Sequence, residues 1–73
     1  MKVEVRLFAT FREGRGKKIY VEMDQPTPIK LLESIGILEE DVAILLINGR
    51  DGKFDQEIND GDYLSVFPPV GGG

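Results

Sequence analysis

The hydrophobic pattern of this chain changes its period twice, and few folds satisfy all of its segments. Residues 2–8 alternate apolar with charged side chains, and residues 19–23 alternate again after a short, basic, glycine-rich link. Alternation with a period of two is typical of half-buried strands, so these segments predict a hairpin. Residues 28–36 instead carry isoleucine and leucine at helical spacing, which predicts a helix with one apolar stripe.

Both ends of that helix are marked in the sequence. Thr27 is a favourable N-cap, and Pro28 follows at the first helical position, where its missing N–H costs nothing. Gly36 suits the C-terminal stop. A helix this short is marginal alone, so its stripe must pack on a sheet. The stripe consists of Ile29, Leu31, Leu32 and Ile35.

The second half of the chain returns to strands. The continuous apolar run 42–47 predicts a central or well-covered strand, which Asn48-Gly49 ends with a turn. Residues 53–54 predict a short strand, and residues 63–68 alternate again before two prolines end the ladder. One helix covering one face of a mixed sheet is the simplest solution, so the sequence predicts an α+β protein of the β-grasp type.

The amino-acid composition excludes several kinds of catalytic and metal-binding site. The 73 residues include no cysteine and no histidine, which removes thiol nucleophiles, persulfide carriers, the usual zinc sites and imidazole bases. A chain without cysteine suits the reducing cytoplasm. No apolar run approaches the ~20 residues of a membrane span, and charges follow Met1 where a signal peptide needs an apolar stretch. We therefore expect a cytoplasmic protein that does not bind membranes.

Charge is distributed unevenly. Residues 1–38 carry seven basic and five acidic side chains, whereas residues 39–73 carry two basic and eight acidic ones. Phosphates demand a basic footprint, so nucleic acid is not the expected partner, and a protein with a basic docking surface fits better. Neither a phosphate-binding loop around Gly16-Lys17 nor a calcium loop starting at Asp55 has the residues that its motif requires.

Four segments together resemble a known family. The segments are Val-Arg-Leu-Phe-Ala-Thr-Phe-Arg-Glu at 5–13, Ile-Asn-Gly at 47–49, Asp-Gly-Asp at 60–62 and Phe-Pro-Pro-Val-Gly-Gly-Gly at 67–73. They resemble the MoaD/ThiS sulfur carriers, which have the ubiquitin-like β-grasp fold. The ending is most similar to that of the molybdopterin synthase small subunit, although Gly71 stands where that subunit usually has alanine, serine or threonine.

The resemblance implies a route for sulfur. A MoeB/ThiF-like partner uses ATP and magnesium to adenylate the carboxylate of Gly73, and a sulfur donor converts the adenylate to a thiocarboxylate. The carrier then delivers sulfur to a MoaE-like large subunit of molybdopterin synthase or to a thiazole synthase-like enzyme. The chain itself binds no cofactor and is not catalytic alone. Its composition agrees, because without cysteine no side-chain thiol can carry the sulfur.

The last residues suit such a role physically. Gly71, Gly72 and Gly73 have no side chains, so they can thread a narrow channel. Six residues from Pro68 onward reach ~20 Å when extended. We expect residues 1–69 to form the domain and residues 70–73 to be a flexible tail that is disordered in the free protein. The alternative is that terminal glycines are merely frayed or left over from cloning.

Two aromatic residues are candidates for docking. Phe8 and Phe67 point away from the face that carries the core, so they lie on the open face of the predicted sheet. They either dock a partner or form a second small hydrophobic cluster, and the family pattern favours docking for Phe67. The other candidate contacts are Arg12, Pro68, Pro69 and Val70.

Several functions remain open. Molybdopterin synthesis, with molybdenum or tungsten, is the leading pathway, and thiamine thiazole or cysteine synthesis are alternatives. Archaeal ubiquitin-like modifiers share this fold and the diglycine end, and they attach to lysines through an isopeptide bond. A plain interaction module would leave the ending Phe-Pro-Pro-Val-Gly-Gly-Gly without explanation.

Overall fold

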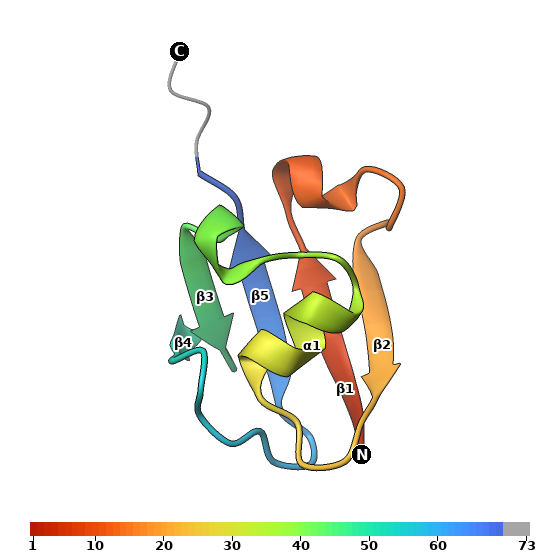
Figure 1. The fold of residues 1–73 in the computed structure, drawn as a ribbon, viewed down its shortest axis with the longest axis vertical. Helices are drawn as coiled ribbons and strands as arrows, with labels where there is room; N and C mark the ends of the chain where they lie inside the picture. Colours follow the sequence, from red (N-terminus) through yellow and green to blue (C-terminus); the bar gives the residue numbers. More distant parts are fainter. Residues whose placement is uncertain (70–73) are drawn as a thin grey trace.

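The structure is a computed structural model that describes residues 1–69. Its centre is a five-stranded mixed sheet with the strand order β2-β1-β5-β3-β4 (Figure 1). The expected tail, residues 70–73, lies outside the described residues. The elements are β1 (Lys2–Leu7), η1 (Ala9–Arg12), β2 (Lys18–Glu22), α1 (Pro28–Ser34), η2 (Glu39–Asp41), β3 (Ile44–Ile47), β4 (Arg50–Asp51) and β5 (Tyr63–Phe67).

The first and last strands lie side by side at the centre. β1 pairs with β2 in antiparallel fashion, with Val3 opposite Val21, and with β5 in parallel fashion, with Val5 opposite Leu64. The alternation predicted for β1 is confirmed, because Val3 and Val5 are buried and the residues beside them are not. In β5, Leu64 is buried as predicted, but Ser65 next to it is buried as well. The link from β1 to β2 contains the 3₁₀ turn η1, which the sequence pattern did not indicate.

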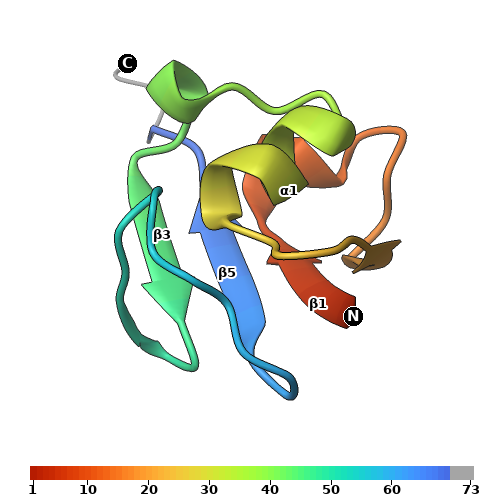
Figure 2. The same ribbon diagram turned by 60° about the horizontal axis from the view of Figure 1, so that its bottom comes forward.

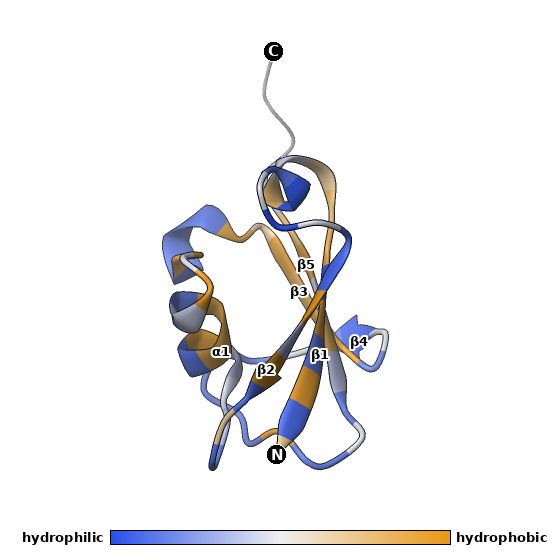
Figure 3. Ribbon diagram, turned by 90° about the vertical axis from the view of Figure 1, so that its right-hand side faces the viewer, coloured by the Kyte–Doolittle hydropathy of each residue, from blue (hydrophilic) through white to orange (hydrophobic). Residues whose placement is uncertain are grey.

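The helix is confirmed with its predicted caps. The hydroxyl of Thr27 accepts a hydrogen bond from the Lys30 N–H at 3.4 Å, Pro28 begins α1, and Gly36 has a φ of +84° just after the helix. α1 lies across one face of the sheet, in front of β1 and β5 (Figures 1 and 2). Seen edge-on, its apolar side faces the sheet, and no helix formed by residues 1–69 covers the other face (Figure 3).

The core fills the space between α1 and the sheet. Leu31 and Leu32 of the helix stripe are buried completely or nearly so, and Ile29 and Ile35 are half-buried. This arrangement is the β-grasp architecture that the sequence predicts. The buried apolar residues are Val3, Val5, Leu7, Phe11, Leu31, Leu32, Ile37, Leu45, Ile47, Ile58, Leu64 and Val66.

The short strand differs from the prediction. It lies at Arg50–Asp51, and the prediction of a strand at residues 53–54 is wrong. Asn48 and Gly49 both have positive φ, at +54° and +81°, so the chain turns within two residues and pairs with β3 at once. Phe54 leaves the sheet, and its carbonyl accepts a hydrogen bond from the Ile29 N–H at 2.9 Å.

Two of the family-like segments meet in space at this turn. The side-chain oxygen of Asn48 accepts from the Tyr63 N–H at 3.0 Å, and its Nδ2 donates to Asp62 Oδ1 at 2.8 Å. The second oxygen of Asp62 accepts from the Asn59 N–H at 2.8 Å. The segments 47–49 and 60–62 therefore hold the β3–β4 turn against the start of β5.

We expect Asn48→Ala to lower the free energy of unfolding by about 1–3 kcal/mol, because it removes two hydrogen bonds worth about 0.5–1.5 kcal/mol each. Asn48→Gly should lose less, since glycine adopts the positive φ without strain. Urea unfolding monitored by circular dichroism measures both variants. An Asn48→Ala protein with the wild-type midpoint would show that these segments do not stabilise the fold.

No helix in residues 1–69 has the length and apolar character needed to cross a membrane.

Candidate functional site: the apolar patch at the end of β5

β1 and β5 run parallel, so they end together at the upper edge of the sheet in Figure 1. Phe8 follows β1 and Phe67 ends β5, and their rings stack with centroids 4.3 Å apart and an angle of 14° between the planes. Both side chains are half-buried on the open face of the sheet. The structure thus joins the two aromatic candidates of the sequence into one contact.

Arg12 completes this contact from the η1 turn. Its guanidinium lies 5.2 Å from the centre of the Phe8 ring, close enough for a cation–π interaction. Its Nε donates to the Leu7 carbonyl at 2.8 Å, which fixes the side chain over the ring. The terminal nitrogens of Arg12 make no hydrogen bond within residues 1–69, so they can donate to a partner's carbonyl or carboxylate groups.

Ile44 extends the patch onto β3. It is the cross-strand neighbour of Phe67, and 48% of its surface is exposed. The backbone beside it is held in place because the Ala43 N–H donates to the Phe67 carbonyl at 2.8 Å. A shallow apolar hollow of about 340 Å³ opens here. Its lining residues are Ala9, Thr10, Ala43, Ile44, Phe67, Pro68 and Pro69.

We call Phe8, Arg12, Ile44, Phe67, Pro68 and Pro69 the tail-base patch, because residues 70–73 follow it directly in the sequence. Its half-buried aromatic rings, exposed isoleucine and cation suit binding to another protein. The candidates Val70, Gly71, Gly72 and Gly73 lie outside the described residues.

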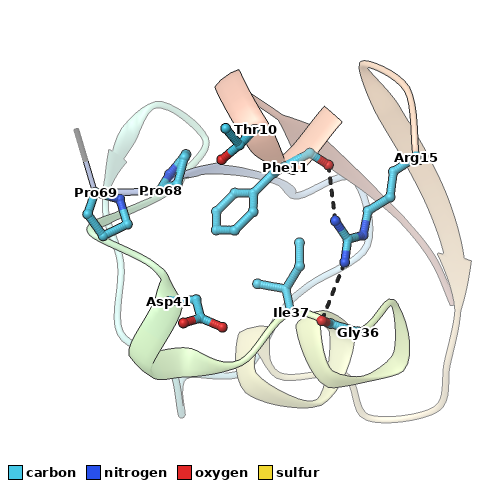
Figure 4. Close-up of a pocket in the computed structure, with 8 residues that line it drawn as sticks. All are labelled: Thr10, Phe11, Arg15, Gly36, Ile37, Asp41, Pro68 and Pro69. Carbon is cyan, nitrogen blue, oxygen red and sulfur yellow. Dashed lines mark hydrogen bonds between the residues drawn. The ribbon is translucent and has the colours of Figure 1, made fainter. Parts of the chain in front are cut away.

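A second hollow lies on the other side of Pro68 and Pro69, between η1 and η2 (Figure 4). Arg15 closes one end of it, because its guanidinium donates to three carbonyls: those of Phe11 at 3.3 Å, Ile35 at 3.0 Å and Gly36 at 3.4 Å. Cations are favourable at these last carbonyls of a helix. Arg15 therefore ties the β1–β2 link to the end of α1, so this residue of the basic, glycine-rich link has a structural role.

Further down the open face, the side chains become polar and aromatic. The Arg6 guanidinium lies 3.9 Å from the centre of the Tyr63 ring. Arg6 also donates to the Glu4 carboxylate, and this hydrogen bond lowers the pKa of Glu4 below its ordinary value. Among residues 1–69 there is no group of three acidic, histidine or cysteine side chains that could hold a metal ion.

Ile44 is the patch residue that the sequence analysis missed. The run 42–47 predicted a central or well-covered strand, and the predicted cover is wrong for Ile44, because α1 covers only the face that carries Leu45 and Ile47. The exposure of Ile44 could have been predicted from the sequence, because a fold with one helix leaves alternate residues of any continuous apolar strand on the uncovered face of the sheet.

Comparisons with known proteins agree with this architecture. The model of the ThiS family matches residues 5–73. Small archaeal modifier protein 3 of Haloferax volcanii is 40% identical over 93 residues, and the match covers 100% of both chains.

Two solved structures connect the chain to molybdopterin-converting factors. A putative molybdopterin converting factor subunit 1 from Pyrococcus furiosus is 31% identical with a TM-score of 0.78, and the match covers 96% of this chain and 99% of that one. A protein–protein complex of subunits 1 and 2 of the molybdopterin-converting factor from Helicobacter pylori 26695 contains a chain that is 26% identical, with a TM-score of 0.61 and full coverage of both chains. The chain therefore belongs to the ThiS family and is a ubiquitin-like small modifier or sulfur carrier of the ThiS/MoaD type.

Proposed function

We propose that this protein is a sulfur carrier whose terminal carboxylate, on Gly73, becomes a thiocarboxylate that donates sulfur in molybdopterin synthesis. The observation that carries this proposal is the position of the ending Val-Gly-Gly-Gly, directly after the tail-base patch in a chain of the ThiS family. A partner that binds the patch would have the terminal carboxylate within ~20 Å of the docking contact.

The chemistry is supplied by partners in two steps. In a MoeB/ThiF-like enzyme, a carboxylate oxygen of Gly73 attacks the α-phosphorus of ATP, and magnesium pyrophosphate leaves. A donor that supplies sulfur at the oxidation level of sulfide then attacks the acyl carbon, so the C–S bond forms and AMP leaves with the shared oxygen. The chain contributes a terminus without side chains and a surface for docking, and it contributes no cysteine.

The recipient of the sulfur is proposed from the solved complex of subunits 1 and 2. In our proposal, a MoaE-like large subunit contacts the tail-base patch with an apolar surface that seats Phe67 and Ile44. Carbonyl or carboxylate groups of that subunit pair with the free guanidinium nitrogens of Arg12.

Reconstitution tests the proposal. The purified protein is incubated with a MoeB/ThiF-like enzyme, magnesium, ATP and a sulfur source, and intact-mass spectrometry follows it. We expect the mass gain of one sulfur replacing one oxygen, dependent on ATP, and loss of that gain when a MoaE-like subunit and the pterin precursor are added. A protein that gains no sulfur while a known carrier does so in the same mixture would contradict the proposal.

Protein modification is the second candidate, favoured by the 40% identity to a small archaeal modifier protein. Both functions begin with the same acyl-adenylate, and they diverge when a lysine amine attacks the acyl carbon in place of sulfur. We expect a strain expressing this protein with Arg in place of Gly71 to yield tryptic lysine peptides that carry a Gly-Gly remnant if the chain is a modifier. The control is the same variant without Gly73, which should yield no Gly-Gly remnant.

A further inference from the structure

The outer edge of β2 is the one long open strand edge within residues 1–69. The sheet order places β2 at one margin and β4 at the other, and β4 has only two residues whereas β2 has five. Free edges are usually protected by charges, prolines or bulges, because their unpaired backbone groups recruit other strands. β2 has no proline, and its register with β1 is unbroken from Lys18 to Glu22.

The register fixes which backbone groups face outward. The Met23 N–H donates to the Met1 carbonyl at 2.9 Å, and the Leu7 N–H donates to the Lys17 carbonyl at 2.8 Å. Hydrogen-bonded and non-hydrogen-bonded pairs alternate in antiparallel strands, so Ile19 and Val21 also direct their backbone groups toward β1. The backbone N–H and C=O groups of Lys18, Tyr20 and Glu22 therefore point away from the sheet.

These three outward residues are arranged symmetrically in charge. Lys18 and Glu22 are exposed on either side of Tyr20, whose exposed fraction is 55%. A strand with one charge sign along its edge would repel its own copy. This strand has opposite signs at equal distances from its middle residue, so it is complementary to itself under a two-fold rotation.

We propose that two copies of this chain associate by antiparallel pairing of their β2 strands, with Tyr20 opposite Tyr20. Lys18 of each copy then lies opposite Glu22 of the other, as a hydrogen-bonded backbone pair with opposite charges. The Tyr20 pair and the two Lys18–Glu22 pairs exchange two backbone hydrogen bonds each, which uses every outward N–H and C=O group. On the helix side, the half-buried Ile19 of each copy lies opposite Val21 of the other.

Charge selects this register over its alternatives. A pairing centred on Lys18 or on Glu22 would place identical charges face to face, and a parallel pairing would set Lys18 beside Lys18. Two nearby charged groups are compatible with the Tyr20-centred register. The Met1 amino group lies 3.5 Å from the Glu22 carboxylate on the β1 side, and the Glu22 side chain remains 74% exposed. Glu4 is the β1 neighbour of Tyr20 and does not face the second copy.

The association is small in area and leaves the tail-base patch uncovered. A five-residue strand pair buries less than the roughly 1,200–2,000 Å² of a stable interface, so the dimer should be transient. β1 separates β2 from β5, which keeps Phe67 and Ile44 accessible in both copies. The inference therefore stands independently of the proposed carrier function.

Charge exchange tests the pairing. Sedimentation velocity of the full chain up to about 1 mM should show a concentration-dependent dimer. K18E alone and E22K alone should each weaken self-association about tenfold, since each places like charges at two symmetric sites. An equimolar mixture of K18E and E22K should associate as well as the wild type, because every cross-strand pair is again opposite in charge. The double variant K18E/E22K should do the same.

Tyr20→Pro is a second test with the fold preserved. The Tyr20 N–H makes no hydrogen bond within residues 1–69, so proline there removes only an outward donor, and edge strands tolerate it. We expect loss of the dimer with an unchanged circular dichroism spectrum, while Tyr20→Val retains the dimer. A wild-type chain that is monomeric at about 1 mM, or a K18E and E22K mixture that associates no better than either variant, would overturn the proposal.

Discussion

Removing Gly73, or adding one residue after it, is expected to lower the rate of sulfur acceptance at least about 100-fold and to leave the fold unchanged. The reason is geometric. The activating enzyme must align one carboxylate with the α-phosphate of ATP, and a misplacement of ~1 Å can cost about 100-fold in rate. One residue moves the carboxylate by ~3.5 Å. The buried core ends at Val66, so the change removes none of its side chains.

A change of length elsewhere in the chain is the matched control. One glycine inserted after Asp24, in the exposed link between β2 and α1, lengthens the protein without moving its terminus relative to the tail-base patch. That variant should accept sulfur at the wild-type rate by intact-mass spectrometry. If the truncated or extended protein gains sulfur as fast as the intact one, then Gly73 does not carry the sulfur.

Local signals in the sequence predicted most of the fold. Val3 and Val5 alternate with charged residues, which identified the buried face of β1. Thr27 and Pro28 placed the start of the helix at the correct residue. These features are intrinsic to short segments, so they can be read without knowing the neighbours. The sequence also predicted that Phe8 and Phe67 lie on the same uncovered face, because strand alternation alone places both residues there. Only the structure shows that their rings stack.

What the sequence could not predict depends on contacts between distant segments. In the sequence Arg15 is one cation of a basic, glycine-rich link, and only the fold brings its guanidinium to the carbonyl of Ile35, 20 residues away. The continuous apolar run hid the exposed position of Ile44, because a run without alternation does not say which face is covered. The β4 strand was misplaced for a local reason, because the two-residue turn at Asn48 and Gly49 starts the strand at Arg50, earlier than predicted.

Phe67→Ala is expected to weaken binding to a large-subunit partner about thirtyfold, while the free protein remains folded. An aromatic anchor at the centre of an interface contributes ~2 kcal/mol or more, and every 1.4 kcal/mol is about tenfold in affinity. The folded state loses the stack with Phe8, which contributes about 0.5–1.5 kcal/mol to stability in addition to the burial of apolar surface. Isothermal titration calorimetry measures the affinity, and urea unfolding measures the stability.

Variants of two residues next to Phe67 distinguish a role in partner binding from a role in the packing of the core. Ile44→Ala changes an exposed side chain opposite Phe67, so it should weaken binding with little loss of stability. Val66→Ala changes a fully buried side chain one position earlier on β5, so it should lower stability and leave the affinity of the folded protein unchanged. If Phe67→Ala instead behaves like Val66→Ala, then the Phe8–Phe67 stack only closes the open face of the sheet, and the partner docks elsewhere.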